Sequence, residues 1–181
     1  LRPYPTQASA GVNGFVSVLQ ICEPQYNWQT TNFVKPDKKN LVIYELLVRD
    51  FAKQNNFQTI IDSINYFKRL GVNAIEFMPL QEFNGNNSWG YNPTFYYALD
   101  KAYGTKNKLK ELIDLLHTNG IAVILDAVYN HMDAGANPQG KLYWDAVNNR
   151  PAANSPWFNA VSPQTFLSFF FFFHYITPAT K

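Results

Sequence analysis

The chain has 181 residues, 46% of them apolar, and its 15 basic and 13 acidic side chains leave a formal net charge of only +2. This length allows one ordinary domain, or part of a larger one, with a sizeable core. A near-neutral charge argues against a nucleic-acid partner, since such surfaces gather lysine and arginine. No apolar run approaches the roughly 20 residues of a membrane span. The lone cysteine, Cys22, can form no internal disulfide, and its apolar neighbours favour a position in the core.

Aromatic residues make up 17% of the chain, as 15 Phe, 11 Tyr and 4 Trp. Tyr and Trp combine a flat apolar face with a polar tip, which suits ligands such as sugars that have both kinds of surface. Aromatic residues also fill cores, so composition alone only suggests carbohydrate binding.

The first part of the chain, residues 1–36, places prolines and glycines around one apolar run at 15–21. Turn residues around a short apolar run are typical of the last strands of a β-rich module or of a lead-in segment. A polar stretch at 37–40 then marks a boundary. We therefore expect three parts, which are residues 1–36, 37–131 and 132–181.

From Leu41 onward, segments with strand and helix character alternate. Helical spacing of apolar residues predicts one helix that ends at Gly71 and a second that Thr105 caps and Gly120 ends. Pro79 ends the second strand, because proline donates no ladder hydrogen bond. The third strand is apolar on both faces, as expected of a buried parallel strand. The predicted strands are residues 41–48, 72–78 and 121–125, and the apolar positions of the helices fall within 60–70 and 109–116.

Strands that alternate with helices, with a single glycine between helix and strand, predict parallel βαβ units and the α/β fold class. Two architectures fit, an open doubly wound sheet and the start of a (β/α)8 TIM barrel. The sequence has no glycine-rich phosphate loop, and its second and third strands are followed by long segments rich in aromatic, amide and carboxylate side chains. Such loops build the functional face of a barrel. We therefore predict the first three βα units of a (β/α)8 barrel, with residues 132–181 as the start of an excursion after strand three.

The third predicted strand runs directly into Asp126, Asn130 and His131. Polar side chains at the end of a buried strand are costly to desolvate unless they find partners or ligands. One such residue alone would indicate a turn or a loop. Three within six residues, at the functional end of a barrel, indicate a binding site.

Four sequence motifs resemble those of one family. They are Asp-Ala-Val-Tyr-Asn-His at 126–131, Gly-Val-Asn-Ala-Ile-Glu-Phe-Met-Pro at 71–79, Trp-Gly-Tyr-Asn-Pro at 89–93 with Asp-Lys-Ala-Tyr-Gly at 100–104, and Tyr-Glu-Leu-Leu-Val-Arg-Asp-Phe at 44–51. In this order and spacing the chain resembles the catalytic domain of the α-amylase family, glycoside hydrolase family 13.

The resemblance implies a role for each matching residue. Tyr91 matches the tyrosine whose ring stacks under the sugar at the cleaved bond, and His131 the histidine that hydrogen-bonds a hydroxyl of that sugar. Asp126 matches an aspartate that organises the site by holding an arginine from the next strand. Trp89 is either a sugar platform or a loop anchor. Asn130 matches a ligand of structural calcium in calcium-dependent members, and calcium stays conditional because this ion takes about 6–8 oxygen ligands.

The resemblance also implies which residues are missing. Retaining glycoside hydrolysis needs a nucleophile and an acid whose carboxyl groups lie about 5–5.5 Å apart. In the family these residues belong to strands four and five, with a stabilising aspartate at strand seven, and no Gly-Phe-Arg-Phe-Asp-like segment occurs here. We therefore expect an N-terminal fragment with no catalytic residue and no activity of its own. The phenylalanine-rich tail at 166–176 has no helix or strand periodicity and fits a sequence error or degenerate coding.

Three other polar residues are expected to have structural roles. Glu76, inside the second strand, is expected to be paired within the barrel. His117 lies in the last turn of its helix, where a positive charge suits the helix dipole. Asp100 is expected to organise a loop.

Three functions remain open. The favoured one is the N-terminal part of an enzyme that cleaves α-glucosidic bonds with retention, as a hydrolase or as a branching-type transferase, with an α-glucan as its partner. The second is a different (β/α) barrel that acts on phosphorylated sugars, although the sequence has no glycine-rich phosphate cradle. The third is a carbohydrate-binding remnant without catalysis.

Overall fold

The computed structural model describes residues 21–22, 24–85, 87–129, 131–133, 137–161 and 174–175. Most of the apolar run at 15–21 and of the phenylalanine-rich tail lies outside these residues. The chain divides into two compact units. Unit 1 comprises Leu1–Leu80 and Leu99–Asp126, and unit 2 comprises Gln81–Ala98 and Ala127–Lys181. The three-part division expected from the sequence stays a prediction.

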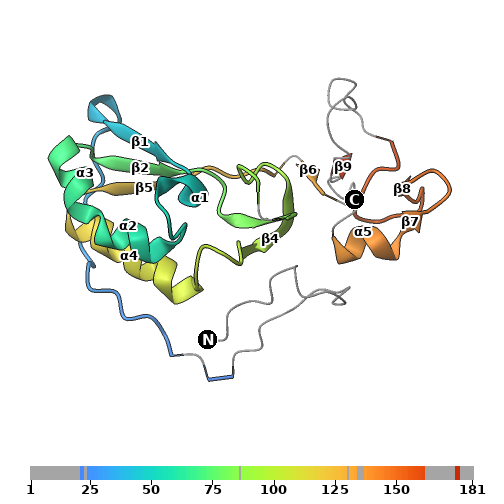
Figure 1. Cartoon of the computed structure of the whole chain (residues 1–181), viewed down its shortest axis with the longest axis horizontal. Helices are drawn as coiled ribbons and strands as arrows, with labels where there is room; N and C mark the ends of the chain where they lie inside the picture. Colours follow the sequence, from blue (N-terminus) through green and yellow to red (C-terminus); the bar gives the residue numbers. More distant parts are fainter. Residues whose placement is uncertain are drawn as a thin grey trace. The chain divides into compact units, whose positions relative to one another are not determined.

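Unit 1 is built on a three-stranded parallel sheet. Its strands are β1 (Ile43–Leu46), β2 (Ala74–Phe77) and β5 (Ala122–Leu125), in the spatial order β1-β2-β5 (Figure 1). Each lies within one of the predicted strands. The order follows the chain without a reversal, as in successive strands of a barrel. The parallel pairing confirms the predicted α/β class.

The helices of unit 1 follow the predicted pattern with one break. The helix predicted over 60–70 is two helices that separate at Ser63, whose Oγ donates to a carbonyl oxygen one turn earlier (2.8 Å). Gly71 ends the second of them with a left-handed φ of 71°. Thr105 Oγ1 accepts from the N–H of Lys108 (3.2 Å) and so caps the long helix, as predicted. The elements are η1 (Lys38–Asn40), α1 (Val48–Phe51), α2 (Phe57–Asp62), α3 (Ile64–Leu70) and α4 (Lys106–Thr118).

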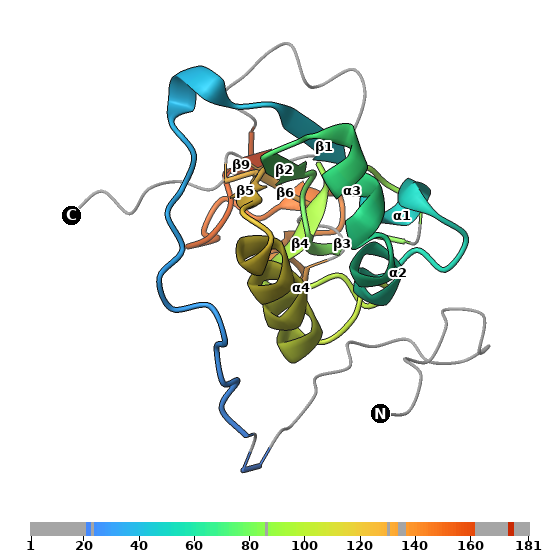
Figure 2. The ribbon, with the colours of Figure 1, turned by 90° about the vertical axis from the view of Figure 1, so that its left-hand side faces the viewer.

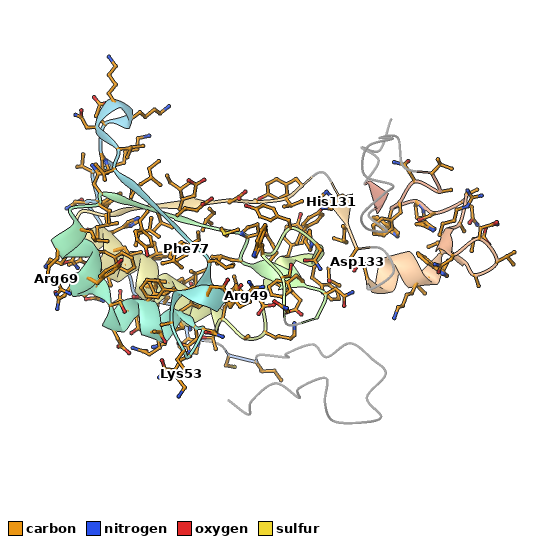
Figure 3. All side chains as sticks on the ribbon, turned by 45° about the horizontal axis from the view of Figure 1, so that its top comes forward. Arg49, Lys53, Arg69, Phe77, His131 and Asp133 are labelled. Carbon is orange, nitrogen blue, oxygen red and sulfur yellow. The ribbon has the colours of Figure 1, made fainter. Side chains whose placement is uncertain are left out.

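The core of unit 1 lies between the sheet and its helices. Helices α2, α3 and α4 cover one face of the sheet in both views (Figures 1 and 2). Phe77 of β2 is fully buried, whereas Arg69 of α3 and Lys53, in the turn before α2, point outward (Figure 3). The helices contribute the fully buried side chains of Phe57, Ile60, Phe67, Leu112 and Leu116.

Strands β1 and β5 are the outer strands of this sheet in the described part of the chain. Ile43 is 46% exposed and Leu125 is 56% exposed, while the central strand β2 is mostly buried. The prediction that the third strand is buried on both faces is therefore wrong. A strand with one neighbour has an open edge, and its side chains lack cover on that side.

The lead-in residues 24–36 form no strand, and hydrogen bonds attach this segment to α4. The Tyr26 hydroxyl and the Gln29 N–H donate to Asp114 Oδ2 (3.0 and 2.8 Å), and the Thr30 N–H donates to Oδ1 (2.8 Å). Asp114 is only 3% exposed. Burial opposes its ionisation, but these hydrogen bonds hold the pKa of Asp114 below its ordinary value. A buried carboxylate thus holds the lead-in segment on the helix.

The structure corrects two predictions and confirms a third. Cys22 is exposed and does not lie in the core. Burial lowers the pKa of His117 against the opposing effect of Asp114, and its ring stacks on Phe33 with centroids 4.0 Å apart. This favours a neutral ring over the predicted positive charge. Asp100 organises its loop as predicted, because its buried Oδ1 accepts from the N–H of Ala102 (2.9 Å).

Unit 2 consists of short paired strands and one short helix. The elements are β3 (Gln81–Phe83), β4 (Pro93–Leu99, its last residue in unit 1), β6 (His131–Met132), α5 (Pro138–Leu142), β7 (Trp144–Asp145), β8 (Arg150–Pro151) and β9 (His174–Tyr175). The pairs are β3 with β4, β6 with β9 and β7 with β8. Met132 and Phe158 form its buried cluster, against which Tyr96 and Trp144 pack. Phe83 of β3 is buried as well.

None of the helices in the described part of the chain has both the length and the apolar character that a membrane crossing needs.

Candidate functional site

Asp126 lies at the carboxyl edge of the parallel sheet. Leu46, Phe77 and Leu125, the last residues of the three strands, are aligned in register. The N–H of Asp126 then donates to the carbonyl oxygen of Phe77 (2.9 Å), so the ladder continues for one more residue. The half-buried side chain of Asp126 thus starts from the edge where barrel proteins place their functional loops.

Trp89 and Tyr91 lie in the loop between β3 and β4, in unit 2. Ser88 Oγ accepts from the N–H of Gly90 (3.0 Å) and hydrogen-bonds Asn92 Oδ1, so the loop has its own internal support. Gly90 has a φ of 92°, which a residue with a side chain rarely adopts. Trp89 is 63% exposed and Tyr91 36% exposed. Two aromatic side chains are therefore open to a ligand on a structured loop.

His131 is bonded to this loop. Its Nε2 lies 2.7 Å from the backbone carbonyl oxygen of Tyr91. A carbonyl oxygen can only accept, so Nε2 carries the hydrogen. This contact brings together the 89–93 motif and the 126–131 motif, which are far apart in the sequence.

Asp133 and Asn137 are also bonded to β4 or to the loop before it, and Figure 3 shows Asp133 close to His131. The N–H of Asp133 donates to the carbonyl oxygen of Pro93 (2.9 Å), and its carboxylate accepts from Asn84 Nδ2 (2.9 Å). Four residues further on, the buried Asn137 donates from Nδ2 to the Thr94 carbonyl oxygen (2.6 Å). His131, Asp133 and Asn137 are thus each bonded to β4 or to the loop before it.

Sequence reasoning missed one residue of this site, Tyr96, whose hydroxyl donates to the carbonyl oxygen of His131 (2.7 Å). Its segment was expected to be a long loop. The run Phe95-Tyr96-Tyr97, rich in β-forming aromatic residues, is the signal that could have predicted β4. Nothing in the sequence could have shown that the hydroxyl reaches His131.

The structure brings together Tyr91 and His131 from the predicted set, with Trp89 two residues away in the same loop. Asp126 belongs to unit 1, and its closeness to this pair stays a prediction. Asn130 lies outside the described residues. Within those that are described, no three or more His, Cys, Asp or Glu side chains gather in a way that could hold a metal ion. Calcium therefore stays a prediction too.

Comparison with known proteins gives a consistent result. Residues 30–170 match the family described as "Alpha amylase, catalytic domain". The chain is 39% identical over 132 residues to the malto-oligosyltrehalose trehalohydrolase of Saccharolobus solfataricus, covering 73% of this chain and 23% of that protein. It is 34% identical over 134 residues to the 1,4-alpha-glucan branching enzyme of Francisella tularensis subsp. mediasiatica, covering 68% of this chain and 21% of that protein.

The fold comparison agrees. The crystal structure of a putative alpha amylase from Salmonella typhimurium is similar with a TM-score of 0.62 and 31% identity, over 76% of this chain and 23% of that one. The chain thus spans about a quarter of the length of these proteins. Because the family match extends over most of the sequence, the chain belongs to the alpha-amylase catalytic-domain family.

Proposed function

We propose that this chain carries the sugar-contacting part of an enzyme that cleaves α-glucosidic bonds of starch-like or glycogen-like glucans with retention of configuration. The observation that carries the proposal is the hydrogen bond between His131 and the backbone of Tyr91. It joins the imidazole of His131, in β6, to the backbone of the loop that carries the exposed Tyr91 and Trp89 rings.

The chemistry of these two residues suits a glucose unit. The flat ring of Tyr91 can cover the C–H face of a pyranose and exclude water from it. The imidazole of His131 can exchange hydrogen bonds with a sugar hydroxyl. Trp89, more exposed than Tyr91, would extend the aromatic surface to a neighbouring glucose unit.

Asp126 has a supporting role in the proposed site. Its position at the carboxyl end of β5 suits a carboxylate that holds an arginine from a neighbouring strand. In this arrangement β1, β2 and β5 would be the first three strands of an eight-stranded barrel.

The catalytic carboxyl groups are proposed to lie outside these 181 residues. Retention requires a nucleophile and an acid about 5–5.5 Å apart, and the motifs present here correspond to binding residues. The chain by itself would then bind glucans without cleaving them.

A branching-type transferase is the second candidate, and the similarity to a branching enzyme favours it. Both candidates use the same sugar contacts and differ in the acceptor that receives the glucan. The residues discussed above serve either reaction equally.

Calorimetric titration of the 181-residue chain with maltotriose tests the proposal, with cellotriose as the stereochemical control. We expect maltotriose to bind and cellotriose to bind more weakly. Tyr91→Ala should weaken maltotriose binding, whereas Tyr97→Ala, at a fully exposed tyrosine of β4, should not. Equal binding of both sugars, or an unchanged affinity of Tyr91→Ala, would contradict the proposal.

A further inference from the structure

Tyr96 lies in the middle of β4 and has a different environment from the tyrosine that follows it. Its half-buried ring packs against the Met132 and Phe158 cluster, and its centroid lies 5.9 Å from that of Tyr129. Tyr97, the next residue, is fully exposed. Adjacent strand residues point to opposite faces, so the two side chains offer a matched comparison.

The hydroxyl of Tyr96 donates to the carbonyl oxygen of His131 (2.7 Å), and the imidazole of His131 in turn donates to the carbonyl oxygen of Tyr91 (2.7 Å). Two hydrogen bonds in series therefore connect the middle of β4 to the aromatic loop. The hydrogen bond from Tyr96 holds the backbone at residue 131. The hydrogen bond to Tyr91 depends on the position of that backbone, because it starts from the side chain of the same residue. Burial raises the pKa of Tyr96 to about 12, which keeps its hydroxyl a donor.

Other contacts hold the same segment, including the pairing of His131 in β6 with Tyr175 in β9. The N–H of Asp133 bonds to Pro93, and its carboxylate to Asn84. Met132 is buried in the unit 2 cluster. Loss of the Tyr96 hydroxyl would thus leave the segment attached and remove the hydrogen bond that ties the carbonyl oxygen of His131 to β4.

We propose that Tyr96 is a positioning residue of the sugar site, whose hydroxyl sets the backbone of His131 and thereby holds its imidazole on the carbonyl of Tyr91. The role in sugar binding rests on the proposed function. The positioning itself does not, because the two hydrogen bonds exist without a sugar.

The test compares Tyr96→Phe with Tyr97→Phe in the 181-residue chain. The first readout is the side-chain ¹⁵N spectrum of His131, which reports the tautomer without any ligand. We expect the Nε2–H form to dominate in the parent chain and in Tyr97→Phe, and to lose population in Tyr96→Phe. An unchanged His131 spectrum in Tyr96→Phe would overturn the proposal.

The second readout is the dissociation constant for maltotriose. Tyr96→Phe should weaken binding roughly fivefold, the effect of one lost hydrogen bond, while Tyr97→Phe stays at the parent value. If the parent chain does not bind maltotriose but the His131 spectrum changes, the proposed function fails and the positioning by Tyr96 stands. If the parent chain binds and Tyr96→Phe binds equally well, the role of Tyr96 in the sugar site is wrong.

A further measurement covers the case in which Tyr96→Phe does not fold. Replacement of Tyr96 by 3-fluorotyrosine makes the hydroxyl more acidic with little change in volume. We expect the carbonyl ¹³C shift of His131 to move, and the same replacement at position 97 to leave it in place. A carbonyl shift that responds to neither replacement would overturn the proposal.

Discussion

The imidazole Nε2 of His131 lies 2.7 Å from the backbone carbonyl oxygen of Tyr91. The bond sets the orientation of the imidazole relative to the loop that carries the exposed Tyr91 and Trp89 rings. A group that is already held in place loses less freedom when a ligand binds, which improves affinity without any new contact. Replacing His131 should therefore affect both a sugar contact and the loop.

The first prediction concerns His131→Ala. We expect this change to weaken maltotriose binding by about tenfold, because a hydrogen-bonding group and the anchor of the Tyr91 loop are lost together. Calorimetry with the 181-residue chain measures the effect. His117→Ala, which removes a histidine from unit 1, is the control and should retain the parent affinity. A His131→Ala chain that binds as tightly as the parent would exclude His131 from the site.

The second prediction is a pH dependence that originates at Asp114. The pKa of this carboxyl is held below its ordinary value in the folded chain. The ionised carboxylate of Asp114 therefore stabilises the folded chain fully above the unfolded-state pKa, about 3.9. This stabilisation is lost as the pH falls through the lower folded-state pKa. Urea unfolding between about pH 6 and about pH 2 should show a stability loss at the acid end.

Two variants separate this effect from that of other carboxyl groups. Asp114→Asn should lower stability near neutral pH and flatten the acid loss, because the charged acceptor is gone. Tyr26→Phe removes only one donor to the same carboxylate and should have a smaller effect of about 1 kcal/mol. An acid profile that is identical in the parent and in Asp114→Asn would refute the assignment to Asp114.

The third prediction concerns Gly104, which has a φ of +133°. A Cβ at this position would lie 2.9 Å from Cδ2 of Phe57, whose side chain is fully buried. Gly104→Ala should therefore destabilise unit 1 by about 2–4 kcal/mol through backbone strain and overpacking together. Gly71→Ala is the control, because its φ is +71° and a Cβ added there would meet nothing within 4 Å. It should cost only about 1 kcal/mol. Equal losses in the two variants would show that the contact with Phe57 is unimportant.

The fourth prediction concerns Glu45 and Glu76, which are register neighbours on the parallel strands β1 and β2. No ion pair to Glu76 is present in the described part of the chain, so its expected pairing is not seen there. Two like charges side by side on a sheet are destabilising, so Glu76→Gln should raise the unfolding free energy by about 0.2–1 kcal/mol. A denaturant series at neutral pH measures this change, and a loss of stability would show that Glu76 has a favourable partner.

Sequence periodicity predicted the elements whose formation is decided locally. The helix cap at Thr105, the left-handed end of α3 at Gly71 and the strand that Pro79 follows all depend on residues close in sequence. The break at Ser63 was missed, because a serine side chain competes for a backbone carbonyl inside an otherwise helical pattern.

Features that depend on distant partners could not be predicted. The exposure of Leu125 is decided by which strands surround β5, and an apolar sequence does not specify its neighbours. The hydrogen bond from Tyr96 to His131 joins residues 35 positions apart, and a tyrosine in an aromatic run gives no sign of it. The family motifs predicted Tyr91 and His131 as site residues, and the structure brings these two residues together, while their contact with a sugar stays a prediction.

Intermolecular nuclear Overhauser effects between maltotriose and assigned aromatic side chains test the central claim most directly. The account predicts contacts from the ring protons of Tyr91 to the C–H protons of one glucose unit, with weaker contacts from Trp89. Contacts confined to other rings, such as the fully exposed Tyr97, or no contacts at saturating maltotriose, would contradict it.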